Sequence, residues 1–136
     1  ENYTNFGQPP SLVTCSRDTF NPAQYRSLAS IKYIVEQMQS LVSHLAAHHM
    51  CHGDLYAHNV LVNADNKIIF GDFGAASHYE YLPNAVQNAV QIIEQRAFGF
   101  FIEDLLTACN DSDDDPQTLS ELQQLAASLI SPASLA

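Results

Sequence analysis

HGDLYAHN, residues 52–59, and GDFG, residues 71–74, are the two stretches that decide how this chain folds. Each combines glycine with Asp or Asn, and the hydrophobic runs VLVN and KIIF lie between them. These runs, joined by a compact polar turn, predict a β-hairpin over residues 60–70. Because a hairpin returns the chain to the edge where it began, the two polar stretches are expected to lie close together.

Three side chains in these stretches carry oxygen atoms suited to phosphoryl transfer, namely Asp54, Asn59 and Asp72. Phosphoryl transfer needs metal ions that bridge phosphate oxygens and a carboxylate that orients the attacking hydroxyl. Magnesium prefers hard oxygen ligands. The pattern therefore predicts Asp54 as the catalytic carboxylate, with Asn59 and Asp72 as magnesium and cofactor ligands. Taken singly, each residue is more typical of a turn beside a strand.

HGDLYAHNVLV followed by GDFG resembles the catalytic loop and the metal-binding loop of the protein-kinase-like superfamily, with signatures HRDLxxxxN and DFG. The matching residues are His52, Asp54, Leu55, Asn59, Asp72, Phe73 and Gly74. The resemblance implies ATP-dependent transfer of the γ-phosphoryl group to a hydroxyl, with ATP and Mg²⁺ as cofactors and a protein Ser, Thr or Tyr as the favoured acceptor. It also implies that Leu61 lies under the adenine ring and that His52 packs beside Phe73.

The resemblance covers most of the chain. An amphipathic helix at 31–48 stands where kinases place the helix before the catalytic loop, and EQRAFG (94–99) resembles their DVWSxG segment, with Glu94 in the Asp position. SLVTC and SRDTF, at about 11–20, resemble the last small-lobe strand and the hinge. The fold class expected over 1–136 is therefore mainly α with a small β-hairpin, a kinase-like C-terminal lobe whose N-terminal lobe is missing from the chain.

Departures from the family pattern leave other functions open. Gly53 replaces the Arg of HRD, Tyr56 stands in the place of a phosphate-neutralising lysine, and neither an APE sequence nor a glycine-rich loop with its lysine is found. We therefore expect a fragment that is inactive alone. One alternative is a non-catalytic, pseudokinase-type docking module. Another is a small-molecule kinase of the aminoglycoside or choline type, because HGD is similar to the loop of those enzymes.

Further helices are predicted from hydrophobic periodicity and from capping residues. A short helix is expected at 22–29 after Asn21, a long one at 85–107, and a final one after a capping box made by Thr118 and Glu121. The polar, proline-containing stretch 1–10 is expected to be irregular.

Composition limits the partners and the compartment. The net charge is −10 and the chain has 5 Lys and Arg residues, which disfavours nucleic acid and anionic membranes. No apolar run approaches the roughly 20 residues that span a bilayer. Cys15, Cys51 and Cys109 are odd in number and far apart, which favours a reducing compartment and hence a cytoplasmic protein.

Two metal alternatives are weaker than structural roles for the same residues. His44 and His48 stand one helical turn apart with Cys51 and His58 nearby, a spacing that can hold zinc, although both histidines fit the polar face of the helix. The aspartates of 111–115 alternate like a calcium loop but lack its glycine and its terminal glutamate, so they fit a solvated loop better.

Overall fold

The computed structural model of the protein describes residues 3–9, 18 and 20–132. It is mostly helical, as the sequence predicts, and it has two small antiparallel sheets, of which the sequence predicts only the hairpin in the first. In chain order the elements are β1 (Thr4–Asn5), η1 (Pro22–Gln24), α1 (Leu28–Ala47), β2 (Met50–Cys51), η2 (Ala57–Asn59), β3 (Val60–Val62), β4 (Ile68–Phe70), η3 (Phe73–Ala75), β5 (Ser77–His78), α2 (Asn84–Thr107) and α3 (Pro116–Ile130).

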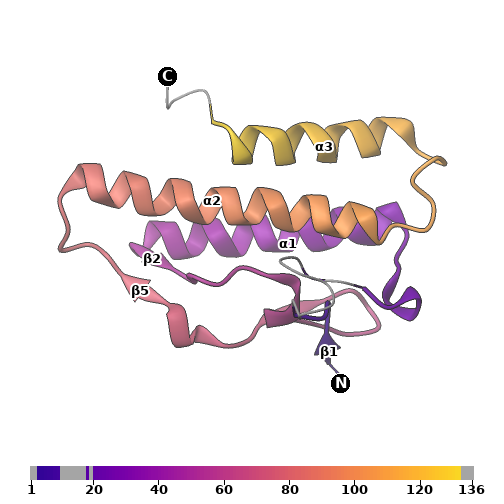
Figure 1. Ribbon diagram of the computed structural model, residues 1–136, viewed down its shortest axis with the longest axis horizontal. Helices are drawn as coiled ribbons and strands as arrows, with labels where there is room; N and C mark the ends of the chain where they lie inside the picture. Colours follow the sequence, from indigo (N-terminus) through magenta and orange to yellow (C-terminus); the bar gives the residue numbers. More distant parts are fainter. Residues whose placement is uncertain (1–2, 10–17, 19, 133–136) are drawn as a thin grey trace.

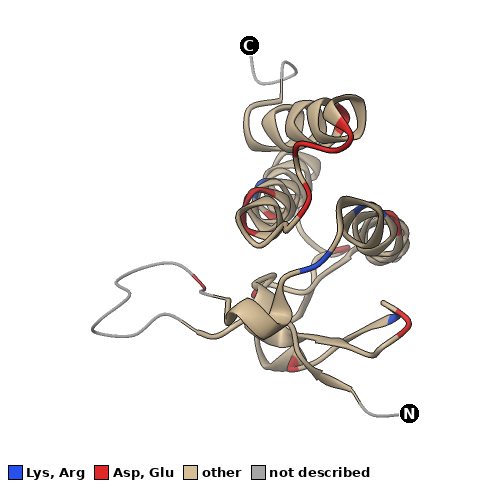
Figure 2. Cartoon of the chain, turned by 90° about the vertical axis from the view of Figure 1, so that its right-hand side faces the viewer, with Lys and Arg blue, Asp and Glu red and all other residues tan. Residues whose placement is uncertain are grey.

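The long helices form a layer on one side of the molecule, and the strands and loops lie on the other side (Figures 1 and 2). Helix α2 packs against both α1 and α3, and α3 runs back along it in the opposite direction (Figure 1). Within the described part of the chain, no helix combines the length and the apolar character that crossing a bilayer requires. Lys and Arg are sparse and scattered over this arrangement (Figure 2).

Helix α1 buries an apolar stripe at three- and four-residue steps, as its sequence pattern predicts. The buried residues of this stripe are Leu28, Ile31, Ile34, Val35 and Met38. The helix begins earlier than expected, because the side chain of Ser27 caps it by accepting a hydrogen bond from Ser30 N at 3.1 Å.

The helix predicted at 22–29 is wrong, although its cap is correct. Over residues 22–27 only the 3-10 turn η1 forms, with Asn21 as its N-cap, and Leu28 already belongs to α1. Tyr25 and Ser27 have extended backbone, which ends η1 and sets up the start of α1. The N-cap at Ser27 therefore splits the predicted helix 22–29 into the turn η1 and the first residues of α1.

The predicted hairpin is confirmed as β3 and β4. Its antiparallel register pairs Val60 with Phe70, Leu61 with Ile69 and Val62 with Ile68. The expectation of an irregular stretch at 1–10 is wrong in part, because β1 adds to the free edge of β3, and Phe6 is 2% exposed in the core. The predicted strand and hinge at about 11–20 lie largely outside the described residues.

A second antiparallel pair closes around the hairpin. Strand β2 pairs with β5, with Met50 opposite His78 and Cys51 opposite Ser77. The segment 50–78 therefore folds back on itself through two ladders. The β2–β5 ladder joins its two ends, and the β3–β4 ladder forms the hairpin in its middle. The catalytic-loop stretch 52–59 and the GDFG stretch run side by side between these ladders.

Helix α3 closes the helical layer against α2 at Gly99. A Cβ atom on this residue would lie 2.7 Å from Ile130 Cγ1 and 2.9 Å from Ala126 O, so the close packing of the two helices requires glycine here. The capping box expected at Thr118 and Glu121 is wrong. Asp115 is the N-cap of α3 instead, and its side chain accepts a hydrogen bond from Thr118 N at 3.1 Å.

Candidate functional site

The two polar loops are joined through their backbones where the hairpin ends. Gly71 N donates a hydrogen bond of 2.7 Å to Asn59 O, continuing the β3–β4 ladder by one step. Asp72 follows Gly71 directly, so the chain brings its backbone beside Asn59. The expectation that the hairpin brings the loops together is confirmed.

Asp54 and Asn59 are in direct contact across the first loop. Asn59 Nδ2 donates to Asp54 Oδ2 at 2.8 Å and to Asp54 O at 2.9 Å, and Asn59 is 8% exposed. Both partner atoms are acceptors, so the nitrogen of the amide must face them. Asn59 Oδ1 is consequently turned away from Asp54.

Asp72 is held at the start of η3 in a left-handed conformation, with φ of 47°. Its Oδ1 accepts a hydrogen bond from Gly74 N at 3.1 Å, and the residue is exposed. Among the described residues its carboxylate makes no hydrogen bond with Asp54 or Asn59. The backbone beside Asp72 is thus bound to Asn59, whereas the Asp72 carboxylate is hydrogen-bonded to Gly74 of its own loop.

This set of oxygens fits magnesium in its chemistry. Asn59 Oδ1 and the carboxylate of Asp72 are hard ligands on neighbouring loops, and the cation takes few protein ligands besides phosphate oxygens and water. Two like-charged carboxylates, Asp54 and Asp72, sit on adjacent loops, and a bound cation would offset their repulsion.

His52 is a structural residue at the centre of the site, as expected. It is fully buried, with its ring centroid 5.0 Å from that of Phe70 and 4.8 Å from that of Phe73. His52 Nδ1 accepts from Asp54 N at 3.2 Å, so Nε2 carries the proton and donates to Gly71 O at 2.9 Å. The ring therefore joins the catalytic loop to the GDFG loop.

Glu94 of α2 fixes the start of the loop 52–59 through hydrogen bonds to its backbone. Its carboxylate accepts hydrogen bonds from His52 N and from Gly53 N, the second at 3.3 Å. Burial raises the pKa of the Glu94 carboxyl, although these two hydrogen bonds act in the opposite direction. The position given to Glu94 by the family resemblance is therefore a position that orders the loop.

Gly53 has a conformational reason to replace the arginine of the family pattern. Its φ is +84°, and a Cβ atom on it would lie 2.3 Å from Ala75 O. A side chain at this position would both strain the backbone and collide with the GDFG loop. The glycine thus permits the two loops to approach closely.

Leu61 lies on β3 between Asn5 of β1 and Ile69 of β4. Its neighbours Val60 and Val62 point into the core, so the half-buried Leu61 belongs to the outer face of the sheet, as does Ile69, which is 48% exposed. An adenine ring would have to reach this outer face. No nucleotide contact tests the expectation, which stays a prediction.

Sequence analysis missed one polar pair at the site, Asp18 and His58. His58 N donates to Asp18 Oδ2 at 2.8 Å, and His58 Nδ1 lies 3.0 Å from Asp18 Oδ1. The Asp18 side chain is fully buried, whereas that of His58 is 22% exposed. These residues are far apart in the sequence and match no motif, so no local signal could have found them.

The alternative metal sites find no support. Over residues 3–9, 18 and 20–132, no group of three or more His, Cys, Asp or Glu side chains is placed to hold a metal. His44 and His48 pack edge to face on α1 with centroids 4.5 Å apart. Burial raises the pKa of the Cys51 thiol, and the charge of Glu94 acts in the same direction.

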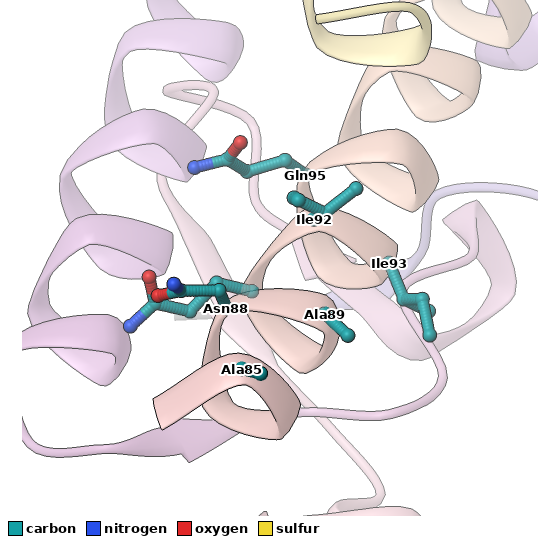
Figure 3. A pocket seen from close by; sticks show the side chains of 7 residues that line it. Ala85, Asn88, Ala89, Ile92, Ile93 and Gln95 are labelled. Carbon is teal, nitrogen blue, oxygen red and sulfur yellow. The ribbon is translucent and has the colours of Figure 1, made fainter. Parts of the chain in front are cut away.

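An open groove of about 720 Å³ runs along the first half of α2 (Figure 3). Figure 3 shows Asn88 and Gln95 extending to one side of the helix and Ile93 to the other. Every described lining residue comes from α2, so this groove contains none of the residues predicted for catalysis.

The chain belongs to the family described as protein tyrosine and serine/threonine kinase, which matches residues 12–95. This range is more than half of the chain and contains both polar loops. The kinase-like resemblance read from HGDLYAHN and GDFG is thereby confirmed.

A similar protein is fibroblast growth factor receptor 1 of Xenopus laevis, which is 31% identical over 80 residues. That stretch is 59% of this chain and 10% of the receptor, so the chain spans about a tenth of the length of this relative. No solved structure matches the chain.

Proposed function

We propose that residues 1–136 are the C-terminal lobe of a kinase domain and that the protein containing them transfers the γ-phosphoryl group of ATP to a hydroxyl. Family membership supports kinase chemistry, and the helical layer with its small sheets is compatible with this lobe. The segment at about 11–20 would supply the hinge to a preceding lobe, without which the chain is expected to be inactive.

One observation carries the proposal: Asp54 and Asn59 share a hydrogen bond of 2.8 Å, while Asn59 O is bound to Gly71 beside Asp72. A loop that only turns the chain has no need to bring two such side chains together next to a third oxygen-bearing residue. Phosphoryl transfer does need this, because its catalysis consists of positioning and charge stabilisation.

Each residue then has a distinct role. Asp54 would accept the proton of the acceptor hydroxyl through the carboxylate oxygen that Asn59 does not occupy. In the same step, the acceptor oxygen forms its bond to the γ-phosphorus, and the bond to the oxygen shared with the β-phosphate breaks. Asn59 and Asp72 would hold Mg²⁺, which when bound neutralises charge on the phosphate oxygens. Leu61 would pack against adenine.

The test uses the full-length protein and two measurements. Thermal unfolding with and without ATP and Mg²⁺ should show a magnesium-dependent rise in melting temperature, and Asp72→Ala should abolish that rise. Transfer of labelled phosphate to protein and small-molecule acceptors should be detectable in the wild type. A control variant is Asp65→Ala, in the exposed turn of the hairpin. No shift and no transfer would contradict the proposal.

A non-catalytic docking module is the second candidate, favoured by the absence of the arginine and lysine at Gly53 and Tyr56. A small-molecule kinase is the third, and acceptor profiling separates it from a protein kinase. We favour a protein acceptor and a cytoplasmic location. The cytoplasmic location is proposed because the cysteines are odd in number and far apart. Among the described residues, Cys51 and Cys109 form no disulfide.

A further inference from the structure

Helix α2 is longer than the helix that covers it. Helix α3 runs back along α2 and ends at Ile130, which lies against Gly99 in the middle of α2. In Figure 1 the first turns of α2 extend past this end of α3. The groove of about 720 Å³ is lined by residues of 85–95, the part of α2 that precedes the contact with Ile130.

The groove continues the face of α2 on which α3 packs. Residues four, seven, eleven and fourteen positions apart share one face of an α-helix. The residues at these distances before Gly99 all line the groove, namely Gln95, Ile92, Asn88 and Ala85. The surface that receives α3 therefore extends past the end of α3, toward the start of α2.

This surface is exposed and carries no charge. Ile93 is 67% exposed, and Ala85 and Ala89 are exposed small residues that let another helix approach closely. Residues 84–93 contain no Asp, Glu, Lys or Arg, although the net charge of the chain is −10. An exposed apolar surface on a soluble fold is typical of an interaction site.

The amide side chains of this part of α2 fall into two groups. Gln87 donates to backbone oxygens of the loop before the helix, and Gln91 Nε2 donates to Tyr79 Oη at 3.1 Å. Asn88 and Gln95 instead extend together to one side of the helix (Figure 3), and their side-chain amides have no hydrogen-bond partner among the described residues. An amide is both a donor and an acceptor, so it can pair with an identical amide.

Charge and symmetry favour a second copy of the protein as the occupant of this groove. Two copies that each carry a charge of −10 repel each other, so they can approach most easily through a surface without acidic residues. A two-fold interface also requires a patch that is complementary to itself. Alanine, isoleucine and amide side chains fulfil this condition, because each kind packs or pairs with its own kind. A basic partner would find no carboxylate on this surface.

We propose that the groove on α2 is a dimer interface, in which a second copy of the protein packs the first half of its own α2. The helix of the second copy lies in line with α3 and runs in the same direction as α3, so the two α2 helices are antiparallel. Ala89 of one copy then lies near Ala89 of the other. The inference does not depend on phosphoryl transfer, because no residue of the loop 52–59 lines this groove.

The first experiment measures self-association of the full-length protein by sedimentation velocity, from about 1 µM to about 500 µM. The groove follows about 15 Å of helix, at 1.5 Å per residue, which is less than a standard-size interface uses. We therefore expect a dissociation constant in the micromolar range. Ala89→Glu should raise this constant about tenfold or more, because two unpaired carboxylates would be buried against each other. A wild-type protein that stays monomeric over the whole range would overturn the proposal.

Ala29→Glu is the matched control for this experiment. Ala29 is an exposed alanine at the start of α1, which lies beside the far end of α2 through the bridge between Arg26 and Cys109. Glutamate is a good helix former at an exposed position, so both variants should keep the wild-type melting temperature at low concentration. Equal dissociation constants for Ala89→Glu and Ala29→Glu would overturn the proposal.

The second experiment uses salt to separate this interface from one made by charges. Added salt screens the repulsion between two acidic copies and does not weaken contact between uncharged surfaces. Raising sodium chloride from about 50 mM to about 500 mM should therefore lower the dissociation constant several-fold. A dissociation constant that rises with salt would assign the association to charged residues outside the groove and would overturn the proposal.

The third experiment identifies the occupant of the groove. Ala89→Cys is labelled with a maleimide in dilute and in concentrated full-length protein, and the labelled peptide is quantified by mass spectrometry. Residue 89 should react when the protein is dilute and be protected when it is concentrated, whereas Ala29→Cys should react in both. Protection of residue 89 at every concentration would mean that another segment of the same protein covers the groove. Reaction at every concentration would mean that nothing covers it, and either result would overturn the proposal.

Discussion

The helical layer and the segment 50–78 are held together by different interactions. In the layer, apolar side chains such as Ile34, Met38 and Ile102 are completely buried against neighbouring helices. In the segment, the short strands also bury Val60, Val62 and Phe70 in the core. There, however, buried polar groups, above all His52, fix the loops through hydrogen bonds to backbone atoms.

This difference separates stability from function. Apolar packing is non-directional and roughly proportional to buried area, so many sequences can satisfy it. Hydrogen bonds to backbone groups are directional, and each leaves an unsatisfied group when it is lost. Single substitutions in the segment, or of Glu94, which holds the loop from α2, should therefore change the geometry of the loops as well as stability. Apart from the groove along α2, other substitutions in the layer should change only the free energy of unfolding.

The largest expected effect is on catalysis. Asp54→Asn in the full-length protein should lower turnover about a thousandfold, because an amide cannot accept the hydroxyl proton. Its amide oxygen can still accept from Asn59 Nδ2, so the melting temperature should change little. Asp65→Asn, in the exposed hairpin turn, is the control with unchanged turnover. Turnover near the wild-type value in Asp54→Asn would show that Asp54 is not the catalytic carboxylate.

The next effect is on stability and comes from one glutamate. Glu94→Ala leaves His52 N and Gly53 N without their acceptor, so unfolding should require about 3 kcal/mol less free energy. Urea unfolding followed by circular dichroism measures this difference. Glu36→Ala, on the exposed side of α1, should change stability little. A similar small change in both variants would mean that Glu94 does not order the loop.

A smaller loss is expected where the two loops touch. Gly53→Ala places a methyl group against Ala75 O on a residue with positive φ, which should cost about 2 kcal/mol. Gly74→Ala is the matched control and should lose less stability, because its new Cβ would meet only a side-chain oxygen of Asp72, at 3.0 Å. Thermal unfolding compares the two, and equal losses would contradict the close approach of the loops.

In the helical layer, the removal of a cap should have a local effect. Ser27→Ala removes the hydrogen bond to Ser30 N and should cost about 1 kcal/mol. Ser43→Ala, at an exposed interior position of the same helix, should be neutral or slightly stabilising. Chemical denaturation gives both values, and neither variant should alter acceptor preference. A change of acceptor preference in Ser27→Ala would break the separation between layer and loops.

The smallest expected effect is a change in how the free energy of unfolding depends on pH. The pKa of Glu94 is raised in the folded protein, so between its ordinary value and the raised value the folded state binds more protons than the unfolded state. Stability from this group therefore falls as pH rises through that window. Glu94→Gln should lack this part of the slope when the free energy of unfolding is measured against pH. Parallel curves for both proteins would contradict the raised pKa.

Much of the layer was predictable because its signals are local. The stripe of α1 depends on apolar residues at three- and four-residue steps within one stretch. Outside the layer, the hairpin of β3 and β4 depends on two apolar runs joined by a short polar turn, which is also a local signal. Strand β1 was not predictable, because two residues acquire strand structure only from the edge of β3. The cap of α3 was also misplaced, since Asp115 and Thr118 are equally suitable by sequence and the loop before the helix selects between them.

The sequence by itself determined the family, the long helices and the residues that carry oxygen at the site, because these depend on residue identity and short-range spacing. Tertiary structure alone decided the contact between Asp18 and His58, the burial of Glu94 under His52, and the turn of the Asp72 carboxylate toward Gly74. These are directional contacts, and those between distant segments exist only once the chain has folded. Sequence spacing carries no information about such angles and distances.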